Sequence, residues 1–165
     1  MEIKVSSSNE QDAVVSLYQR VAETPGGLAR LRDEVTPDYV TGFLDRAHAS
    51  GLSLIAVDDG QVIGEIHAYS PGLFCFSHVW SDLTIAVDPS AQGRGVGRAL
   101  FAAFMDEVRA HSEVDRVELI ARESNQRAIA FYETLGFRQE GRFEARIRNV
   151  DDSIEADIPM AWLRD

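Results

Sequence analysis

The sequence has very little cysteine and no long apolar run. Among its 165 residues Cys75 is the single cysteine, so no disulfide can form within the chain. No stretch approaches the ~20 apolar residues that a membrane helix needs. The first residues also lack the apolar core of a signal peptide. These absences predict a cytoplasmic protein without a membrane association.

Positive charge is also scarce. The chain carries 16 Lys and Arg against 27 Asp and Glu, which gives a formal net charge of −11 and a pI of about 4.7. A negative field repels phosphate backbones, so nucleic acid is not an expected ligand. Such a field attracts cationic amines, although it can equally serve solubility alone.

The sequence lacks the residue spacings that mark several kinds of catalytic site. The histidines at 48, 67, 78 and 111 show no metal-ligand spacing, and we expect no metal site. The chain has no G-x-S-x-G nucleophile elbow, and no motif surrounds Cys75. The G-x-x-x-x-G-K-[ST] loop of ATP-binding proteins is absent as well.

Hydrophobic periodicity and turn residues predict one α/β domain over residues 1–165. Two early helices are predicted. The first follows a capping box at Ser8 to Gln11 and ends near Ala22, and the second begins at Thr36-Pro37 and ends near Gly51. Two later helices are predicted over residues 96–111 and 126–135. Strands are expected at 3–5, 52–57, 61–69, 79–87 and 117–121, followed by an antiparallel pair at 137–147 and 154–163. The sheet should therefore be mixed, and antiparallel at both ends.

The strand over residues 79–87 has two faces if it alternates regularly. One face would carry Val79, Ser81, Leu83, Ile85 and Val87. The other would carry Trp80, Asp82, Thr84 and Ala86.

A glycine-rich loop follows this strand and opens directly into a helix. Backbone N–H groups of such a loop, together with a helix N-terminus, can form an anion site. Gly93 and Gly95 fit the start of the dinucleotide fingerprint G-x-G-x-x-G, but Arg98 stands where its last glycine is required. The loop instead satisfies Q-x-x-G-x-G with Gln92, Gly95 and Gly97. A tight turn with ordinary glycines explains these alternating glycines and the neighbouring arginines less well than an anion site does.

A second motif lies about 28 residues downstream, with Asn125, Ala128, Tyr132 and Gly136 in and after a helix. The two motifs in this order resemble the GNAT superfamily of acetyl-CoA-dependent N-acetyltransferases. The resemblance covers the chain from about Leu52 to its end. It implies an α/β fold with a mixed, mostly antiparallel central sheet, a splayed strand pair and flanking helices.

The resemblance also implies roles for individual residues. The loop amides would hold the pyrophosphate of coenzyme A, and they belong to Gln92, Gly93, Arg94, Gly95, Val96, Gly97 and Arg98. The strand end before the loop would bond the pantetheine arm through Ile85, Ala86 and Val87. The later helix would face the cofactor with Asn125, Ala128 and Tyr132, and the tyrosine would lie near the sulfur.

Acetyl transfer to an amine makes definite chemical demands. The ammonium must lose a proton, the thioester carbonyl must be polarised, and the leaving thiolate must be protonated. Tyr132 is the predicted general acid, although an aromatic residue on an amphipathic helix can also simply pack in the core. Acetyl-CoA would be the co-substrate that brings the acetyl group.

The general base is less well defined by the sequence. Some family members carry a glutamate five residues before the asparagine, where this chain has Ile120. Asp82 is the predicted base, with Glu65 as the next candidate, followed by His67 and His78. A solvated carboxylate or ion-pair partner explains Asp82 about equally well, and ordered water can also carry the proton.

The acceptor is predicted from weaker features. Glu65 and Trp80 are the candidates for the acceptor side, although a large strand aromatic is more often core. The pattern from Gly136 to Arg142 resembles a branch that acetylates free amino acids and small amines, and in it Arg142 could pair with a substrate carboxylate. A protein N-terminus, a polyamine and an aminoglycoside are alternatives, as is a non-catalytic acyl-CoA sensor. Family relatives dimerise through their C-terminal strands, which makes a homodimer the default expectation.

Overall fold

The structure is a computed structural model that describes residues 1–165. Its four α-helices are α1 (Gln11–Ala22), α2 (Pro37–Ser50), α3 (Val96–Ala110) and α4 (Gln126–Thr134). Its strands are β1 (Glu2–Val5), β2 (Gly51–Asp58), β3 (Gln61–Tyr69), β4 (Val79–Val87), β5 (Arg116–Arg122), β6 (Arg138–Gln139), β7 (Phe143–Arg148) and β8 (Ile154–Leu163). The predicted helices and the strands through β5 are confirmed within one or two residues.

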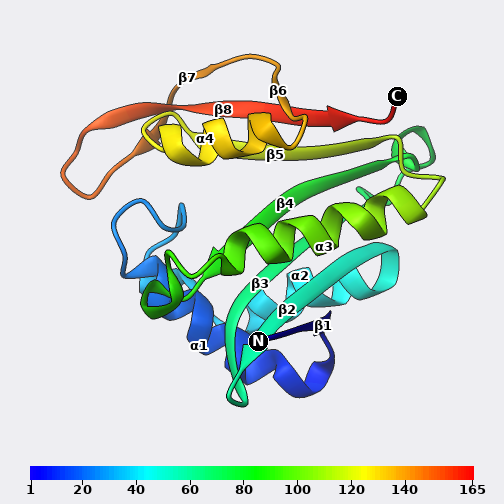
Figure 1. Ribbon diagram of the computed structural model, residues 1–165. Coiled ribbons are helices and arrows are strands. Elements are labelled where there is room, and N and C mark those ends of the chain that lie inside the picture. The colour runs from blue at the N-terminus through cyan, green and yellow to red at the C-terminus, as the bar shows by residue number, and fades with distance from the viewer.

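All eight strands join one sheet in the order β1-β2-β3-β4-β5-β8-β6, and β7 also pairs with β8. Every pairing is antiparallel except β4 with β5, which is parallel. Figure 1 shows these two central strands close at one end and diverging toward the other. The predicted α/β class, with a mixed, mostly antiparallel sheet, a splayed pair and flanking helices, is confirmed.

Neighbouring residues of a strand point to opposite faces of the sheet, so apolar side chains emerge on both faces. Helices cover both of them. On one face, Tyr18 of α1 and Phe43 of α2 pack on Ile55 and form the core with other apolar residues of both helices. On the other face, Leu100, Phe101 and Phe104 of α3 pack on Leu54, Ile66 and Leu83. We call the first the α1/α2 face and the second the α3/α4 face, since α4 also packs there through Ile129.

The helix starts follow the predicted signals with one correction. Thr36 caps α2 and accepts from the N–H of Tyr39 at 3.2 Å, and Pro37 stands at the first position. The first capping box does not begin at Ser8: Ser7 accepts from Asn9 and donates to Glu10. It caps a short 3₁₀ turn over Ser8–Glu10, and α1 then begins at Gln11.

The C-terminal arm also differs from the expectation. The segment predicted as one strand over 137–147 is broken into β6 and β7, and both pair with β8. Residues 140–142 between them are not in a strand, and Ala145 has φ 51°, which interrupts the register within β7. None of the helices is both long enough and apolar enough to cross a bilayer.

Candidate active site

The glycine loop between β4 and α3 presents unpaired backbone donors. Gly93 and Gly95 have φ values of 77° and 82°, in the left-handed region that glycine adopts without strain. The first bond of α3 runs from the N–H of Ala99 to the oxygen of Gly95 at 3.0 Å. No backbone oxygen accepts from the N–H groups of Gly93, Gly95, Val96, Gly97 or Arg98. These donors, with the positive end of the helix dipole, form a site suited to a phosphate group.

Side chains on either side hold the loop in place. Asp88 accepts from the backbone N–H of Ser90 at 2.9 Å and from Nε of Arg20 at 2.7 Å, which ties the loop to α1. Arg94 donates to Asp58 at 2.6 Å and is therefore already paired. Arg98 lies over the ring of Phe131 at 5.9 Å and has no carboxylate partner. Arg98 is thus the loop cation that is available to a ligand.

The first turn of α3 lies against the end of β4 at Gly97. A Cβ atom at this position would lie 3.4 Å from Cγ2 of Val87 and 3.9 Å from Cδ1 of Ile85. Ile85 and Val87 pack on the α3/α4 face, whereas Ala86 is buried on the α1/α2 face. Ile85 and Val87 therefore lie directly beside the glycine loop, while the side chain of Ala86 points to the opposite face.

The same end of β4 has one free edge. β4 and β5 pair only at Val79 with Arg116 and at Trp80 with Val117. From Ser81 onward β4 has no partner on that side, although its other edge still pairs with β3. Backbone groups along Ile85 to Val87 can therefore bond an extended ligand that lies between the diverging strands (Figure 1).

The later motif brings a tyrosine into the α3/α4 core. Asn125 caps α4 through its side-chain oxygen, which accepts from the N–H of Ala128 at 3.2 Å. The Tyr132 ring packs against Phe101, with 5.5 Å between the ring centroids. Burial alone raises the pKa of Tyr132 to about 12. The hydroxyl is therefore protonated at neutral pH and can donate a proton.

The middle of β4 departs from regular alternation, which corrects one expectation. Trp80 and Leu83 both lie in the α3/α4 core, although alternation would place them on opposite faces. The register with β3 shifts between His67 and Tyr69, and Asp82 has φ 55°. A bulge at Asp82 thus separates it from Trp80. The Asp82 side chain is exposed and accepts from the hydroxyl of Tyr69 at 3.0 Å.

Glu65, the other acceptor-side candidate, is completely buried on the α1/α2 face. Its carboxylate accepts from the hydroxyl of Tyr18 at 2.5 Å and from that of Ser53 at 2.7 Å. Nδ1 of His67 lies 3.0 Å from the same carboxylate. The structure therefore brings Glu65 and His67 together in a polar cluster inside an apolar core. It leaves His78, another candidate base, exposed on the connection before β4.

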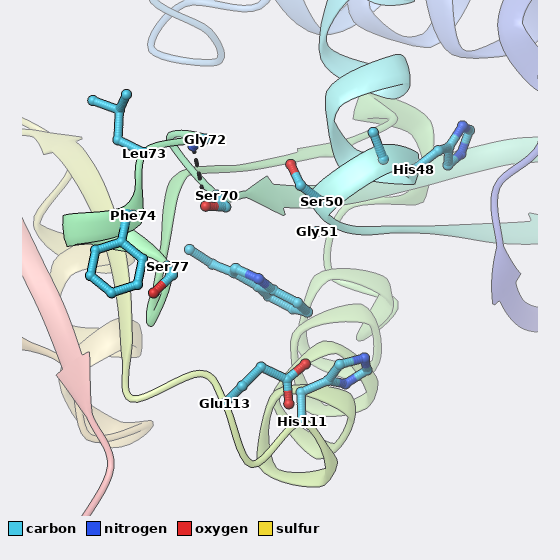
Figure 2. Close-up of a pocket in the computed structure, with 12 residues that line it drawn as sticks. His48, Ser50, Gly51, Ser70, Gly72, Leu73, Phe74, Ser77, His111 and Glu113 are labelled. Carbon is cyan, nitrogen blue, oxygen red and sulfur yellow. Dashed lines mark hydrogen bonds between the residues drawn. The ribbon is translucent and has the colours of Figure 1, made fainter.

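A pocket of ≈ 510 Å³ lies at the opposite end of β4, where β4 and β5 are still paired. Its lining includes Trp80, His48, His111 and Glu113. Figure 2 shows His111 and Glu113 on one wall, with His48 on another. Trp80 therefore faces this pocket and not the free edge of β4 beside the glycine loop.

Some functional contacts were not apparent from the sequence. Tyr18 and Ser53 hold Glu65, but they come from α1 and β2, and no motif links them to β3. Arg142, a candidate for a substrate carboxylate, is already held by Glu123 at 2.6 and 2.8 Å. A sequence signal for the buried cluster does exist, because Glu65 and His67 interrupt a strand that is apolar on both faces.

The comparisons with known proteins agree with this geometry. The chain is 43% identical over 89 residues to a mycothiol acetyltransferase of Salinispora tropica, which is 51% of this chain and 28% of that protein. It is 47% identical over 80 residues to a [ribosomal protein bS18]-alanine N-acetyltransferase of Salmonella typhimurium, covering 47% of this chain and 53% of that protein. The chain thus spans only part of these relatives.

A solved structure of a GNAT-family acetyltransferase from Streptococcus pneumoniae superposes with a TM-score of 0.88 over 99% of both chains, at 21% identity. An acetyltransferase from Salmonella typhimurium, solved with acetyl-CoA and described as putative, gives a TM-score of 0.86 at 18% identity, over 100% of this chain and 94% of the other. The family model described as "Acetyltransferase (GNAT) family" matches residues 13–137 of this chain. The chain belongs to the acetyltransferase (GNAT) family, whose typical acyl donor is acetyl-CoA.

Proposed function

We propose that residues 1–165 form a single N-acetyltransferase domain that moves the acetyl group of acetyl-CoA to a primary amine by direct attack. The observation that carries this proposal is the glycine loop, where five N–H groups have no partner in the chain. They lie at the start of α3, beside the free edge of β4. A pyrophosphate at the loop and an extended pantetheine arm along β4 match this arrangement.

Tyr132 is the proposed general acid. Its hydroxyl is protonated at neutral pH, because burial raises its pKa to about 12. When the amine nitrogen attacks the acetyl carbon, the carbon–sulfur bond breaks and the thiolate needs a proton. Tyr132 supplies that proton, and one of the nitrogen protons restores the hydroxyl, so coenzyme A leaves as a thiol.

The acceptor side is the α1/α2 face near Asp82. Asp82 carries an exposed carboxylate beside the Tyr69 hydroxyl, and this carboxylate can attract an ammonium group or take its proton. We propose a free amino acid or small amine as acceptor, with a protein N-terminus as the alternative. The second choice gains weight from the relatives named for the alanine of ribosomal protein bS18. Relatives named for mycothiol favour a small acceptor.

The test is release of free thiol from acetyl-CoA with a panel of acceptors. The panel should contain single amino acids, alkylamines, aminoglycosides and short peptides with free N-termini. We expect thiol release that depends on the acceptor, with an N-acetylated product detected by mass spectrometry. Tight acetyl-CoA binding without turnover on any amine would favour the sensor alternative, while failure to bind acetyl-CoA would contradict the proposal itself.

A further inference from the structure

The polar cluster on the α1/α2 face contains two buried ionisable residues that have no role in the cofactor site. Glu65 is fully buried and His67 is 2% exposed, yet both are ionisable. Burying such groups is costly unless hydrogen bonds compensate. The hydroxyls of Tyr18 and Ser53 donate to the Glu65 carboxylate, and Nδ1 of His67 lies 3.0 Å from it. These two hydroxyl donors, one on each oxygen, make Glu65 the hydrogen-bond acceptor at the centre of the cluster.

The direction of each hydrogen bond follows from this carboxylate. Ser53 donates its only proton to Glu65, so its oxygen accepts from Ser6 at 2.8 Å. Ser6 has then used its own proton, and Nε2 of His48, 2.9 Å away, must donate to it. Burial, followed by the charge of Glu65, raises the pKa of Tyr18 well above its usual value and keeps its hydroxyl a donor.

The same reasoning fixes the tautomer of His67. Its Nδ1 lies 3.0 Å from Oε2 of Glu65, which already accepts from Tyr18, and Nδ1 can bond this acceptor only as a donor. Nε2 then carries the free lone pair. The only buried side-chain nitrogen or oxygen without a partner is Nε of Arg122. Nε2 of His67 makes no hydrogen bond in the chain and is not such an atom, so it keeps a small accessible area although the residue as a whole is only 2% exposed.

The imidazole is also fixed in orientation. It is stacked on Phe43 of α2 at 4.0 Å with an interplanar angle of 10°, and on Tyr69 at 6.0 Å with an angle of 2°. His67 is directly opposite Thr84 of β4, two residues from Ala86. The ring therefore lies on the acceptor side of the strand that holds the proposed pantetheine arm.

We propose that His67 is the general base of the reaction and that Glu65 is the residue that positions it, an inference that rests on the proposed acetyl transfer. Nε2 takes one proton from the acceptor ammonium, and the Glu65 carboxylate stabilises the resulting imidazolium, as carboxylates do in other His–carboxylate pairs. The neutral amine attacks the acetyl carbon and passes a second proton to the Tyr132 oxygen. The imidazolium finally returns its proton to water, so the protons balance.

The experiment compares two kinds of acceptor. An alkylammonium must lose a proton before it attacks, whereas an alkoxyamine is already neutral at neutral pH. We expect His67→Gln to lower kcat/KM for the alkylamine by about 10²–10⁴-fold, the typical contribution of a positioned base. The same variant should change the rate with the alkoxyamine only a few-fold. His111→Gln, in the distant pocket of Figure 2, is the matched control and should change neither rate.

Glu65→Gln tests the positioning role. A glutamine amide can donate to Nδ1, which would move the ring proton of His67 to Nε2 and remove the lone pair that accepts the substrate proton. We expect a loss for the alkylamine similar to that of His67→Gln. Nitrogen NMR of the wild-type chain should show Nδ1 of His67 protonated, and the variant should show the other tautomer.

The outcomes separate this inference from the proposed function. If both acceptors are acetylated but His67→Gln slows them equally, acetyl transfer stands and His67 is not the base. A loss confined to the alkylamine in Asp82→Asn instead would make Asp82 the base. A wild-type tautomer with the proton on Nε2 would also overturn the inference, even if the variants do not fold. If neither amine is acetylated by the wild type, the proposed function fails first.

Discussion

The two faces of the sheet hold their polar groups in different ways. On the α3/α4 face the glycine loop offers backbone N–H groups from consecutive residues, and their direction is set by the positive φ values of Gly93 and Gly95. On the α1/α2 face the polar atoms belong to side chains from β2, β3, α1, α2 and Ser6, the residue after β1, and they meet around Glu65. One site is local in sequence and the other is assembled by packing.

The difference predicts where each site tolerates change. A backbone cradle is insensitive to most side-chain substitutions but sensitive to any that alters φ. A buried side-chain network behaves in the opposite way, because losing one member leaves its partners unsatisfied. The cofactor side should therefore tolerate substitution at exposed loop side chains other than Arg98, while the acceptor side depends on the identity of each residue in the network.

Tyr132→Phe should have the largest effect, since it removes a proton donor without changing the shape of the site. We expect kcat to fall by about 10²–10⁴-fold, because a positioned acid typically contributes this much. Acetyl-CoA affinity should stay within a few-fold, as the loop amides are untouched. Steady-state kinetics and calorimetric titration measure the two quantities. Tyr39→Phe, which removes a hydroxyl on the other face, is the control. An equal loss of kcat in both variants would contradict the role of Tyr132 as general acid.

Gly95→Ala tests the backbone nature of the cradle. Gly95 has φ 82°, and placing a Cβ residue in this region costs about 1–2 kcal/mol. The free variant loop can relax from this conformation but must return to it if its amides bind the pyrophosphate, so the Kd for acetyl-CoA should rise about 5–30-fold, the same free energy expressed as affinity. The kcat at saturating acetyl-CoA should change little.

Gly60→Ala is the matched control for this substitution. Gly60 has φ 78° in the turn between β2 and β3, and a Cβ atom there would meet nothing within 4 Å. The backbone penalty at Gly60 should lower the melting temperature without altering the glycine loop between β4 and α3. Only Gly95→Ala should weaken acetyl-CoA binding, and equal affinities would mean that the loop does not hold the ligand.

The contrast between the faces also explains what the sequence could reveal. The loop, the cap at Asn125 and the tyrosine at 132 lie within short segments, so spacing alone predicted where they fall in the fold. The bulge at Asp82 could not be predicted, because it depends on the register between β3 and β4 and reverses the direction of Trp80. The Glu65 cluster joins residues up to 49 positions apart, and only tertiary packing brings them together.

Asp82→Asn tests the role of the exposed carboxylate on the acceptor side of β4. If Asp82 only attracts the ammonium, losing an exposed charge should raise the acceptor KM by about 5-fold, in line with the modest free energy of surface charge pairs. Burial, and then the Asp82 charge, raises the pKa of Tyr69 to about 12, so the variant should lower that pKa toward its usual value. Ultraviolet titration follows the tyrosine. A shift of the pH–rate profile to higher pH would instead show that Asp82 is the base.

Asp88→Asn should have the smallest effect, and it concerns the ion pair that joins α1 to the glycine loop. Burial of Asp88 opposes ionisation, but hydrogen bonds from Ser90 and the pairing with Arg20 outweigh it and hold its pKa below the usual value. A carboxyl with a depressed folded-state pKa stabilises the fold above its ordinary pKa and loses this contribution as the pH falls through the depressed value.

We therefore expect Asp88→Asn to lower stability at neutral pH by about 1 kcal/mol, because asparagine keeps the bond to Ser90 but loses the ion pair. The melting temperature should drop by about 2–4 °C. The difference between variant and wild type should shrink in acid, below the depressed pKa. Asp106→Asn, which breaks an exposed pair with Arg109, should leave the melting temperature unchanged at both pH values. An Asp88→Asn difference that persists unchanged in acid would mean that the Arg20 ion pair does not stabilise the loop.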